Sequence, residues 1–388
     1  TGIDGDYSIS VPADAKTLTF SYVGFLTKDV EIGANTKVNV VLSTDAKQLD
    51  EVMVVAYGTV KKESFTGSAS VVKGDVLENR PVTSFEKALQ GAVAGVTVSS
   101  VSGQPGATST VRIRGVGSIS ASSTPLYVID GVPVTTGDLT QVATTADVLS
   151  TLNSSDIESV TVLKDASASS IYGSRAANGV VLITTKKGKA GKTTFNVSST
   201  GGFSSIAVDK PSTFGADQYY KYYWNYYNNQ RLTAGATPDE AALAANASTR
   251  AALTANPFNT ANPFLANGVL APGASLLYDT DWRDEVLRTG VTKDLNVSVS
   301  GGNEKTKFFV SGGTFDQKGI VIGSDFKRYS GKINISNEVN NWLNVGINTT
   351  LGYTEQNTPA GSGGGANPVR FGDMVSNIYS LYQRDAQG

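Results

Sequence analysis

The segment 293–301, KDLNVSVSG, constrains the fold most, because apolar and polar residues alternate along it without interruption. Successive side chains of a β-strand point to opposite faces, so this segment predicts a strand with one apolar and one polar face. The apolar face carries Leu295, Val297 and Val299, and the polar face carries Asn296, Ser298 and Ser300. The pattern is typical either of a sheet with one face in water or of a membrane barrel with lipid outside and water inside.

The spacing of the alternating segments helps to choose between these two structures. Strands are expected at 193–203, 291–301, 306–316, 327–337 and 342–353. The connections are short at 302–305 and 338–341 and longer at 204–290, 317–326 and 354–388. Tight turns at one end and long loops at the other are typical of a membrane barrel, whereas a β-sandwich does not require them.

Composition excludes several classes of protein. The chain has no His and no Cys, which disfavours metal hydrolases and thiol enzymes, so we expect no metal, no cofactor and no enzymatic activity. Lys and Arg number 32 against 34 Asp and Glu, a balance that argues against a nucleic-acid partner. No apolar run approaches the 18 or so residues of a membrane-spanning helix.

The first 60 residues predict small β-structures. Segments 6–11, 17–23, 28–32 and 37–42 are expected to be strands of a partial β-sandwich, and any signal peptide is expected to lie upstream. Residues 49–58, LDEVMVVAYG, then form an apolar run after a polar linker. This run is either one more strand of the sandwich or a tethered peptide that pairs with the sheet edge of a partner protein.

Residues 64–189 predict a compact α+β domain. A helix is expected over 84–95, with Ser84 as its N-cap. Strands are expected at 96–100, 110–115, 125–131, 157–164 and 179–188.

Four segments carry a resemblance to a known family. They are 49–72 (LDEVMVVAYGTVKKESFTGSASVV), 88–119, 125–134 (PLYVIDGVPV) and 171–188 (IYGSRAANGVVLITTKKG). In this order they resemble the SusC/RagA-type TonB-dependent outer-membrane transporters, and the resemblance covers nearly the whole chain.

The resemblance implies a mainly β fold with four parts. These are a carboxypeptidase-regulatory-like β-sandwich (1–43), a linker with a TonB box (44–60), an α+β plug domain (61–189) and the first strands of an outer-membrane antiparallel barrel (190–388) with a long extracellular loop at 204–290. The family barrel has about 22 strands, so five strands are a fragment of it. The residues of the implied TonB box are Asp50, Glu51, Val52, Met53, Val54 and Val55.

Charged residues of the plug are candidates for seating it in the barrel. Arg112 and Arg114 alternate with apolar residues, so both guanidinium groups are expected on one strand face, where they could bind carboxylates of the barrel wall. We expect similar plug-seating contacts from Asp130, Lys164, Asp165 and Arg175. Gly173 and Gly179 permit tight turns.

Other motifs only approximate a chemical site. KKGKAGKT at 186–193 lacks the first glycine of a P-loop and precedes a strand rather than a helix. DTDWRDE at 279–285 departs from a calcium loop and is expected to be a polar turn, and RGVGS at 114–118 has too few glycines for a dinucleotide site.

An aromatic cluster at 219–229, YYKYYWNYYNN, has two interpretations. It either packs a long loop or contacts a partner protein, or it forms a stacking platform for a ligand such as a sugar. The residues are Tyr219, Tyr220, Tyr222, Tyr223, Trp224, Tyr226 and Tyr227, with Tyr220 and Trp224 on a separate side of the expected helix. Thr237 and Pro238 predict the start of a second helix.

The function implied by the resemblance is TonB-dependent import of a bulky nutrient, an oligosaccharide or a peptide, across the bacterial outer membrane. Its expected partners are TonB on the periplasmic side, a SusD-like lipoprotein on the extracellular side, and outer-membrane lipid. Two transporter–lipoprotein pairs could further associate. The alternative is a secreted or surface β-rich adhesin, which would stay soluble without detergent.

Overall fold

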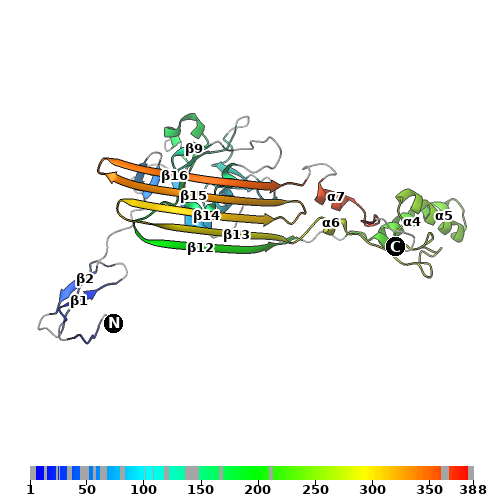
Figure 1. Ribbon diagram of the computed structural model, residues 1–388. Coiled ribbons are helices and arrows are strands. Elements are labelled where there is room, and N and C mark those ends of the chain that lie inside the picture. The colour runs from blue at the N-terminus through cyan, green and yellow to red at the C-terminus, as the bar shows by residue number, and fades with distance from the viewer. Residues whose placement is uncertain are drawn as a thin grey trace. The chain divides into compact units, whose positions relative to one another are not determined.

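The structure is a computed structural model. It describes residues 6–12, 15–22, 25, 27–32, 37–43, 52–55, 58–61, 68–78, 84–100, 102–107, 109–117, 122–134, 136, 148–165, 169–208, 213–359 and 367–382. The chain divides into two units, Thr1–Thr66 and Gly67–Gly388, and each is described separately (Figure 1).

The first unit contains two small antiparallel ladders. β1 (Thr17–Phe20) pairs with β2 (Lys28–Glu31), and β3 (Val52–Val55) pairs with β4 (Gly58–Lys61). The other two strands expected in the sandwich, within 6–12 and 37–43, are not strands in the structure. The Tyr7 hydroxyl donates a hydrogen bond of 2.7 Å to the Val38 carbonyl, which links these two segments.

The second unit begins with a five-stranded mixed sheet in the order β5-β10-β11-β8-β9. Only the β8–β11 pair is parallel among these described strands. The bounds are β5 Ala69–Lys73, β8 Leu126–Ile129, β9 Val132–Val134, β10 Ile157–Leu163 and β11 Val180–Thr185. The sheet buries apolar residues against α1 (Gly74–Glu78), α2 (Phe85–Ala88) and the hairpin of β6 (Val96–Ser100) and β7 (Ser109–Ile113). We call residues 67–189 the plug.

The helix expected over 84–95 is much shorter in the structure. Only Phe85–Ala88 are helical, and the chain then turns at Gly91, which has a φ of 74°. Ser84 does occupy the N-cap position, but its side chain makes no capping hydrogen bond. The apolar spacing of Ala88, Leu89 and Ala92 therefore reflects packing into the plug core rather than a continuous helix.

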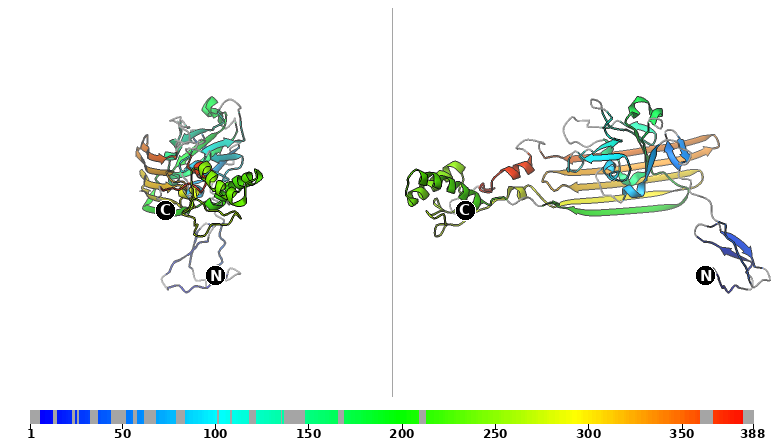
Figure 2. Two further views of the ribbon diagram at one scale, coloured as in Figure 1. Left: turned by 90° about the vertical axis from the view of Figure 1, so that its right-hand side faces the viewer. Right: turned by 180° about the vertical axis from the view of Figure 1, so that it is seen from behind.

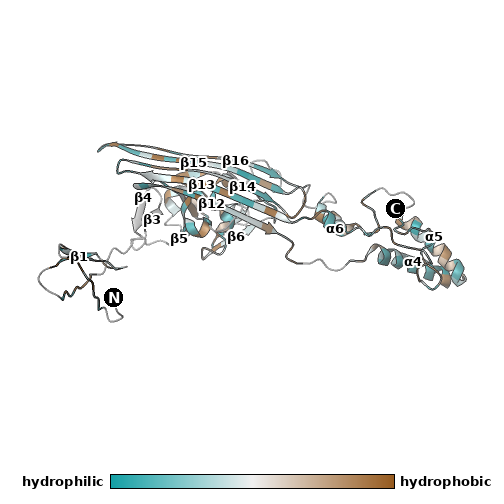
Figure 3. Cartoon of the chain, turned by 60° about the horizontal axis from the view of Figure 1, so that its bottom comes forward, coloured by the Kyte–Doolittle hydropathy of each residue, from teal (hydrophilic) through white to brown (hydrophobic). Residues whose placement is uncertain are grey.

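A second sheet, which we call the wall, consists of five long antiparallel strands in sequence order (Figures 1 and 2). The strands are β12 Gly191–Ser204, β13 Gly290–Gly302, β14 Thr306–Lys318, β15 Asp325–Asn340 and β16 Leu343–Asn357. Each contains nearly all of the strand that the alternating pattern predicts. Figure 3 shows hydrophobic and hydrophilic residues interspersed along these strands.

The long connection between β12 and β13 folds into a helical subdomain. α4 (Ala216–Thr233) and α5 (Pro238–Leu253) lie against each other, as both views of Figure 2 show. Thr237 and Glu240 form a capping box at the start of α5, with a proline in its first turn, as the sequence predicts. The short helix α6 (Trp282–Glu285) lies later in the same connection, and another short helix, α7 (Pro368–Met374), follows β16. Among the described residues, no helix combines the length and apolarity that a membrane crossing requires.

Candidate functional site: the contact between plug and wall

The wall presents its polar face to the plug. Asn153 of the plug donates hydrogen bonds to Asn296 on β13, at 2.6 Å, and to Ser330 on β15, at 3.2 Å. On the opposite face Leu295 and Val297 remain 45% and 41% exposed. This arrangement reverses the sidedness of a sheet in a soluble protein, whose apolar face is covered.

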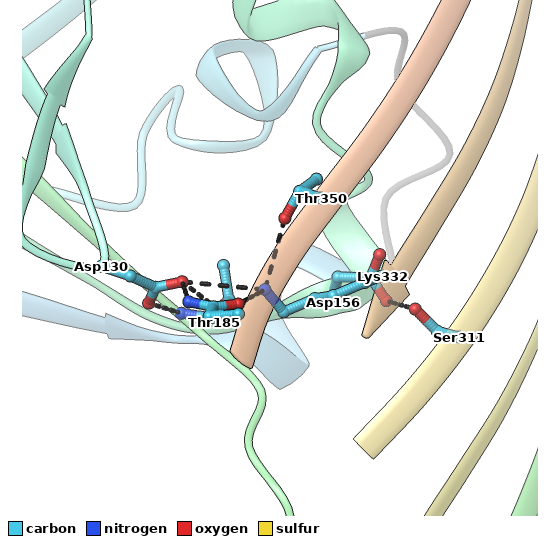
Figure 4. A network of polar contacts seen from close by, with 7 residues as sticks. Asp130, Asp156, Thr185, Ser311, Lys332 and Thr350 are labelled. Carbon is cyan, nitrogen blue, oxygen red and sulfur yellow. Dashed lines mark hydrogen bonds and ion pairs between the residues drawn. The ribbon is translucent and has the colours of Figure 1, made fainter. Parts of the chain in front are cut away.

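Asp130 connects the plug to the wall through the turn between β8 and β9. Asp130 and Gly131 both have positive φ, 48° and 87°, as a two-residue Asp–Gly hairpin turn requires. The Asp130 carboxylate accepts hydrogen bonds from the backbone N–H (2.9 Å) and the hydroxyl of Thr185, and from Asn348 of β16 at 2.8 Å (Figure 4). Burial alone would raise the pKa of Asp130, but these hydrogen bonds and the nearby Lys332 together lower it.

Lys332 of β15 also faces this carboxylate. Its side chain is fully buried, and its ammonium group lies 3.7 Å from the Asp130 carboxylate. It also donates to Asn348 at 2.8 Å and to Thr350 at 3.4 Å. A buried ammonium needs a partner of opposite charge, so Asp130 and Lys332 form an ion pair between plug and wall.

A second contact involves η3 (Ser154–Asp156), a short 3₁₀ turn of the plug. The Asp156 carboxylate accepts a hydrogen bond from Ser311 of β14, as Figure 4 shows. Burial raises the pKa of Asp156, while the Ser311 hydrogen bond and nearby cationic groups oppose that shift. Arg328 of β15 donates to the Leu152 carbonyl at 3.2 Å and stacks over Phe315, with 5.3 Å between the guanidinium carbon and the ring centre.

A small, open polar cavity adjoins this second contact. Its plug side includes an ion pair of 3.0 Å between Lys186 and Glu78. Its wall side is lined by hydroxyl and amide groups of β12, β13 and β14. Polar groups on both sides of a cavity can exchange hydrogen bonds with water, so separating plug from wall here exposes little apolar surface.

A third contact lies near the other end of the wall strands. Gln104 of the plug donates to the Thr358 hydroxyl at 2.8 Å, and Gln356 donates to the Pro105 carbonyl at 2.9 Å. Gly106 has a φ of 76°, and a Cβ there would lie 2.3 Å from the Phe326 ring. Only glycine allows the two domains to approach this closely.

Comparison with known proteins identifies the arrangement. Residues 61–180 match the family model of the TonB-dependent receptor plug domain. TonB-dependent receptor P3 of Formosa agariphila is 35% identical over 97% of this chain and 32% of its own length, and TonB-dependent receptor SusC of Bacteroides thetaiotaomicron is 36% identical over 87% and 29%. A solved structure of the RagAB peptide importer in the open-open state superposes with a TM-score of 0.59 and 33% identity, over 79% of this chain and 32% of that one.

The chain belongs to the SusC/RagA-type TonB-dependent receptors. It spans about a third of the length of the curated relatives it matches. The five wall strands are accordingly part of a receptor barrel, and the mixed sheet belongs to its plug.

Arg112 and Arg114 of the plug are arranged differently from the expectation that they share one strand face. β7 ends at Ile113, and Arg114 has a φ of 57°, so Arg112 and Arg114 do not share a strand face. Arg114 pairs at 2.5 Å with Asp165, a carboxylate of the plug itself, which also accepts a hydrogen bond from the Ser68 N–H. Those contacts with Ser68 and Arg114 lower the pKa of Asp165 despite some desolvation. Among the described residues Arg114 thus pairs within the plug, and its pairing with a wall carboxylate stays a prediction.

The remaining seating candidates divide into two groups. Asp130 does contact the wall, whereas Arg175 is exposed on η4 (Ser170–Ala176) and Lys164 is bonded through its backbone N–H to Ser68. The Arg112 Nε is enclosed with no hydrogen-bond partner among the described residues. Gly173 and Gly179 both have positive φ, at tight turns as expected.

The wall residues of the site were not singled out from the sequence. They are Asn296, Ser311, Arg328, Ser330, Lys332 and Asn348. The sequence does contain one indication of them. In KINISN, residues 332–337, Lys332 and Asn334 alternate with apolar residues and so belong to the polar face of the strand. Lys332 thus lies on the polar face of its strand, where it meets Asp130 of the plug.

The segment expected to be the TonB box is only partly described. Asp50 and Glu51 lie outside the described residues, and Val52–Val55 form β3. β3 pairs with β4 along one edge, and no described strand pairs with its other edge. That edge offers backbone groups to which a further strand could be added.

The aromatic cluster divides according to its helical faces. Tyr220 and Trp224 are buried in the core of the helical subdomain, against Phe258 and Phe264. Burial raises the pKa of Tyr220 to about 12. Tyr222 and Tyr226 are 62% and 60% exposed, and Tyr219, Tyr223 and Tyr227 are half-buried. Packing thus involves Tyr220 and Trp224 and, in part, Tyr219, Tyr223 and Tyr227, whereas the exposed Tyr222 and Tyr226 remain candidates for contact with a ligand or partner.

The approximate motifs have structural roles. Asp279 accepts hydrogen bonds from the Ala216 N–H, at the start of α4, and from Asn377 at 2.8 Å. Asp281 caps α6 through the Arg283 N–H. The segment 186–190 runs directly into β12, as expected for a connection rather than a phosphate-binding loop.

Proposed function

We propose that the protein containing this chain imports a bulky nutrient, an oligosaccharide or a peptide, across the bacterial outer membrane, driven by TonB and assisted by a SusD-like surface lipoprotein. The observation that supports this most is the orientation of the wall. Its polar face, and not its apolar face, contacts the plug, through hydrogen bonds and the buried ion pair of Asp130 and Lys332. A channel that must open and close requires an inner surface from which its plug can separate.

The nature of the contacts suggests how the import step proceeds. The apolar core of the plug lies within the plug, between its own sheet and helices. Its contacts with the wall are mostly polar, through Asp130, Asn153 and Asp156. TonB, added as a strand to the free edge of β3, would pull on the chain that leads into β5 and break these polar contacts first.

Two relatives suggest the kind of cargo. One carries the name SusC, and a solved structure is described as a peptide importer. The exposed Tyr222 and Tyr226 could contact either an arriving sugar or a lipoprotein cap. The adhesin alternative is disfavoured, because a soluble β-protein would cover the apolar wall face that carries Leu295 and Val297.

An uptake assay tests the proposal. Cells that produce the whole receptor receive fluorescent oligosaccharides and peptides, with and without a protonophore. We expect accumulation of one class of compound, and its loss when the protonophore collapses the energy source of TonB. Entry that continues without that energy would exclude TonB-dependent import.

The proposed topology predicts which loops face outward. If the first wall strand runs from the periplasm outward, residues 204–290 are extracellular and 302–305 form a periplasmic turn. Ala245 is buried in the α4–α5 core, so a tag belongs at Gly235, in the turn between the helices. An antibody should label intact cells tagged at Gly235 and not those tagged at Asn303, which would be labelled only after permeabilisation. The reverse result would invert the topology.

A further inference from the structure

The outward face of the wall changes character from one end to the other. Leu295, Tyr329 and Tyr353 lie in one row across the strands, according to the strand register. From this row toward the β15–β16 turn, the outward side chains are mostly apolar. At the far end Trp342, in the β15–β16 turn, is 81% exposed. This face is the apolar band of a membrane-spanning sheet, with aromatic residues at both margins.

The length of the band agrees with a membrane. From Trp342 to Tyr353 the chain covers about 11 residues at about 3.4 Å each, or about 37 Å along the strand. A strand tilt of about 45° reduces this to about 26 Å across the bilayer, close to the roughly 25 Å expected for such a band. Side chains beyond Tyr353 therefore lie at the boundary between lipid and water.

Three lysines occupy that boundary around one aspartate. Lys293 on β13 and Lys327 on β15 lie directly opposite Asp316 on β14, one on each side. Lys318 follows Asp316 two residues later on the same strand and the same face. Neighbouring strands are about 4.8 Å apart, so three flexible ammonium groups can converge on one small anion.

The charges of this cluster are not balanced within the chain. None of the three lysines forms an ion pair with a described residue, and one Asp316 oxygen has no hydrogen-bond partner in the described part of the chain. Asp325, opposite Lys318, is already paired with Arg288. Glu355, opposite Lys327, is the other acid of this row, which leaves the outward cluster net positive.

We propose that Lys293, Lys318 and Lys327 bind the phosphate headgroup of an acidic membrane lipid. The position of the cluster favours this occupant, because the apolar band directly below it would hold the acyl chains. Lysine ammonium groups form charge-assisted hydrogen bonds with phosphate oxygens. The assignment of this boundary to the extracellular side rests on the proposed function, whereas lipid binding itself does not require transport.

Native mass spectrometry of the whole receptor tests the lipid site. The receptor is taken from nanodiscs of phosphatidylglycerol or phosphatidylcholine, and retained lipids are counted. We expect preferential retention of phosphatidylglycerol. The triple variant Lys293→Gln/Lys318→Gln/Lys327→Gln should bind it about 100-fold more weakly, at about fivefold for each lysine. Lys318→Gln alone should weaken binding about fivefold.

The matched control removes the same charge at three lysines that are not part of the wall strands. The variant Lys16→Gln/Lys37→Gln/Lys73→Gln should retain phosphatidylglycerol as the unaltered receptor does. Both triple variants should also import nutrient normally, which separates a failure of this proposal from a failure of the proposed function. Equal lipid retention in the two triple variants would overturn the site. Displacement of the lipid by millimolar inorganic phosphate would also overturn it, because it would reveal a simple anion site.

Discussion

Asp130→Asn should weaken the attachment of the plug to the wall by about 3 kcal/mol, because it leaves the Lys332 ammonium buried without a counter-charge. Asparagine also tolerates positive φ, so the hairpin turn should survive. Hydrogen exchange of the plug peptides 126–134 and 180–185, in the whole receptor, measures the change. Faster exchange in both peptides is expected, with increased entry of large antibiotics into cells.

The partner residue provides the control. Lys332→Met should cost less, about 1 kcal/mol, because Asp130 keeps its hydrogen bonds from Thr185 and Asn348. The double variant should resemble Lys332→Met alone, since no buried cation remains to be neutralised. Strictly additive effects of the two changes would show that Asp130 and Lys332 do not interact.

Val54→Pro should abolish uptake while leaving ligand binding intact. Proline removes the backbone N–H at the centre of β3, and an added TonB strand needs the backbone donors of that edge. Uptake of a fluorescent nutrient and its binding to cells at low temperature are measured side by side.

Val54→Ala is the matched control, because it shortens the same side chain and keeps the N–H. It should import at a rate close to that of the unaltered receptor. Normal uptake by Val54→Pro would place the TonB contact elsewhere, and loss of uptake in both variants would assign the effect to the valine side chain instead of the backbone.

The wall strands could be predicted from sequence because their signal is local. Alternation with a period of two depends only on neighbouring residues, so Leu295 and Asn296 reveal opposite faces without knowledge of the rest of the fold. The short turns at 302–305 and 338–341 mark the strand ends in the same way. The Asp–Gly pair at 130–131 similarly predicts its own hairpin.

The seating of the plug could not be predicted from local pattern. Arg112 and Arg114 have the spacing of a single strand face, but β7 ends between them, and Arg114 then meets Asp165 from a distant part of the chain. Which charges meet depends on how the plug docks against the wall. The same reason explains the helix expected at 84–95, where the apolar spacing serves a core that is formed by distant strands.

The short connection between plug and wall limits how the channel can open. β11 ends at Thr185 and β12 begins at Gly191, so only residues 186–190 join the two domains there. Fully extended, five residues reach at most about 18 Å. The end of β11 is therefore tethered to the start of β12 and can move away from it only as far as these five residues reach. A wider passage therefore requires movement of strands that this connection does not hold, such as β5 at the edge of the sheet, two strands from β11.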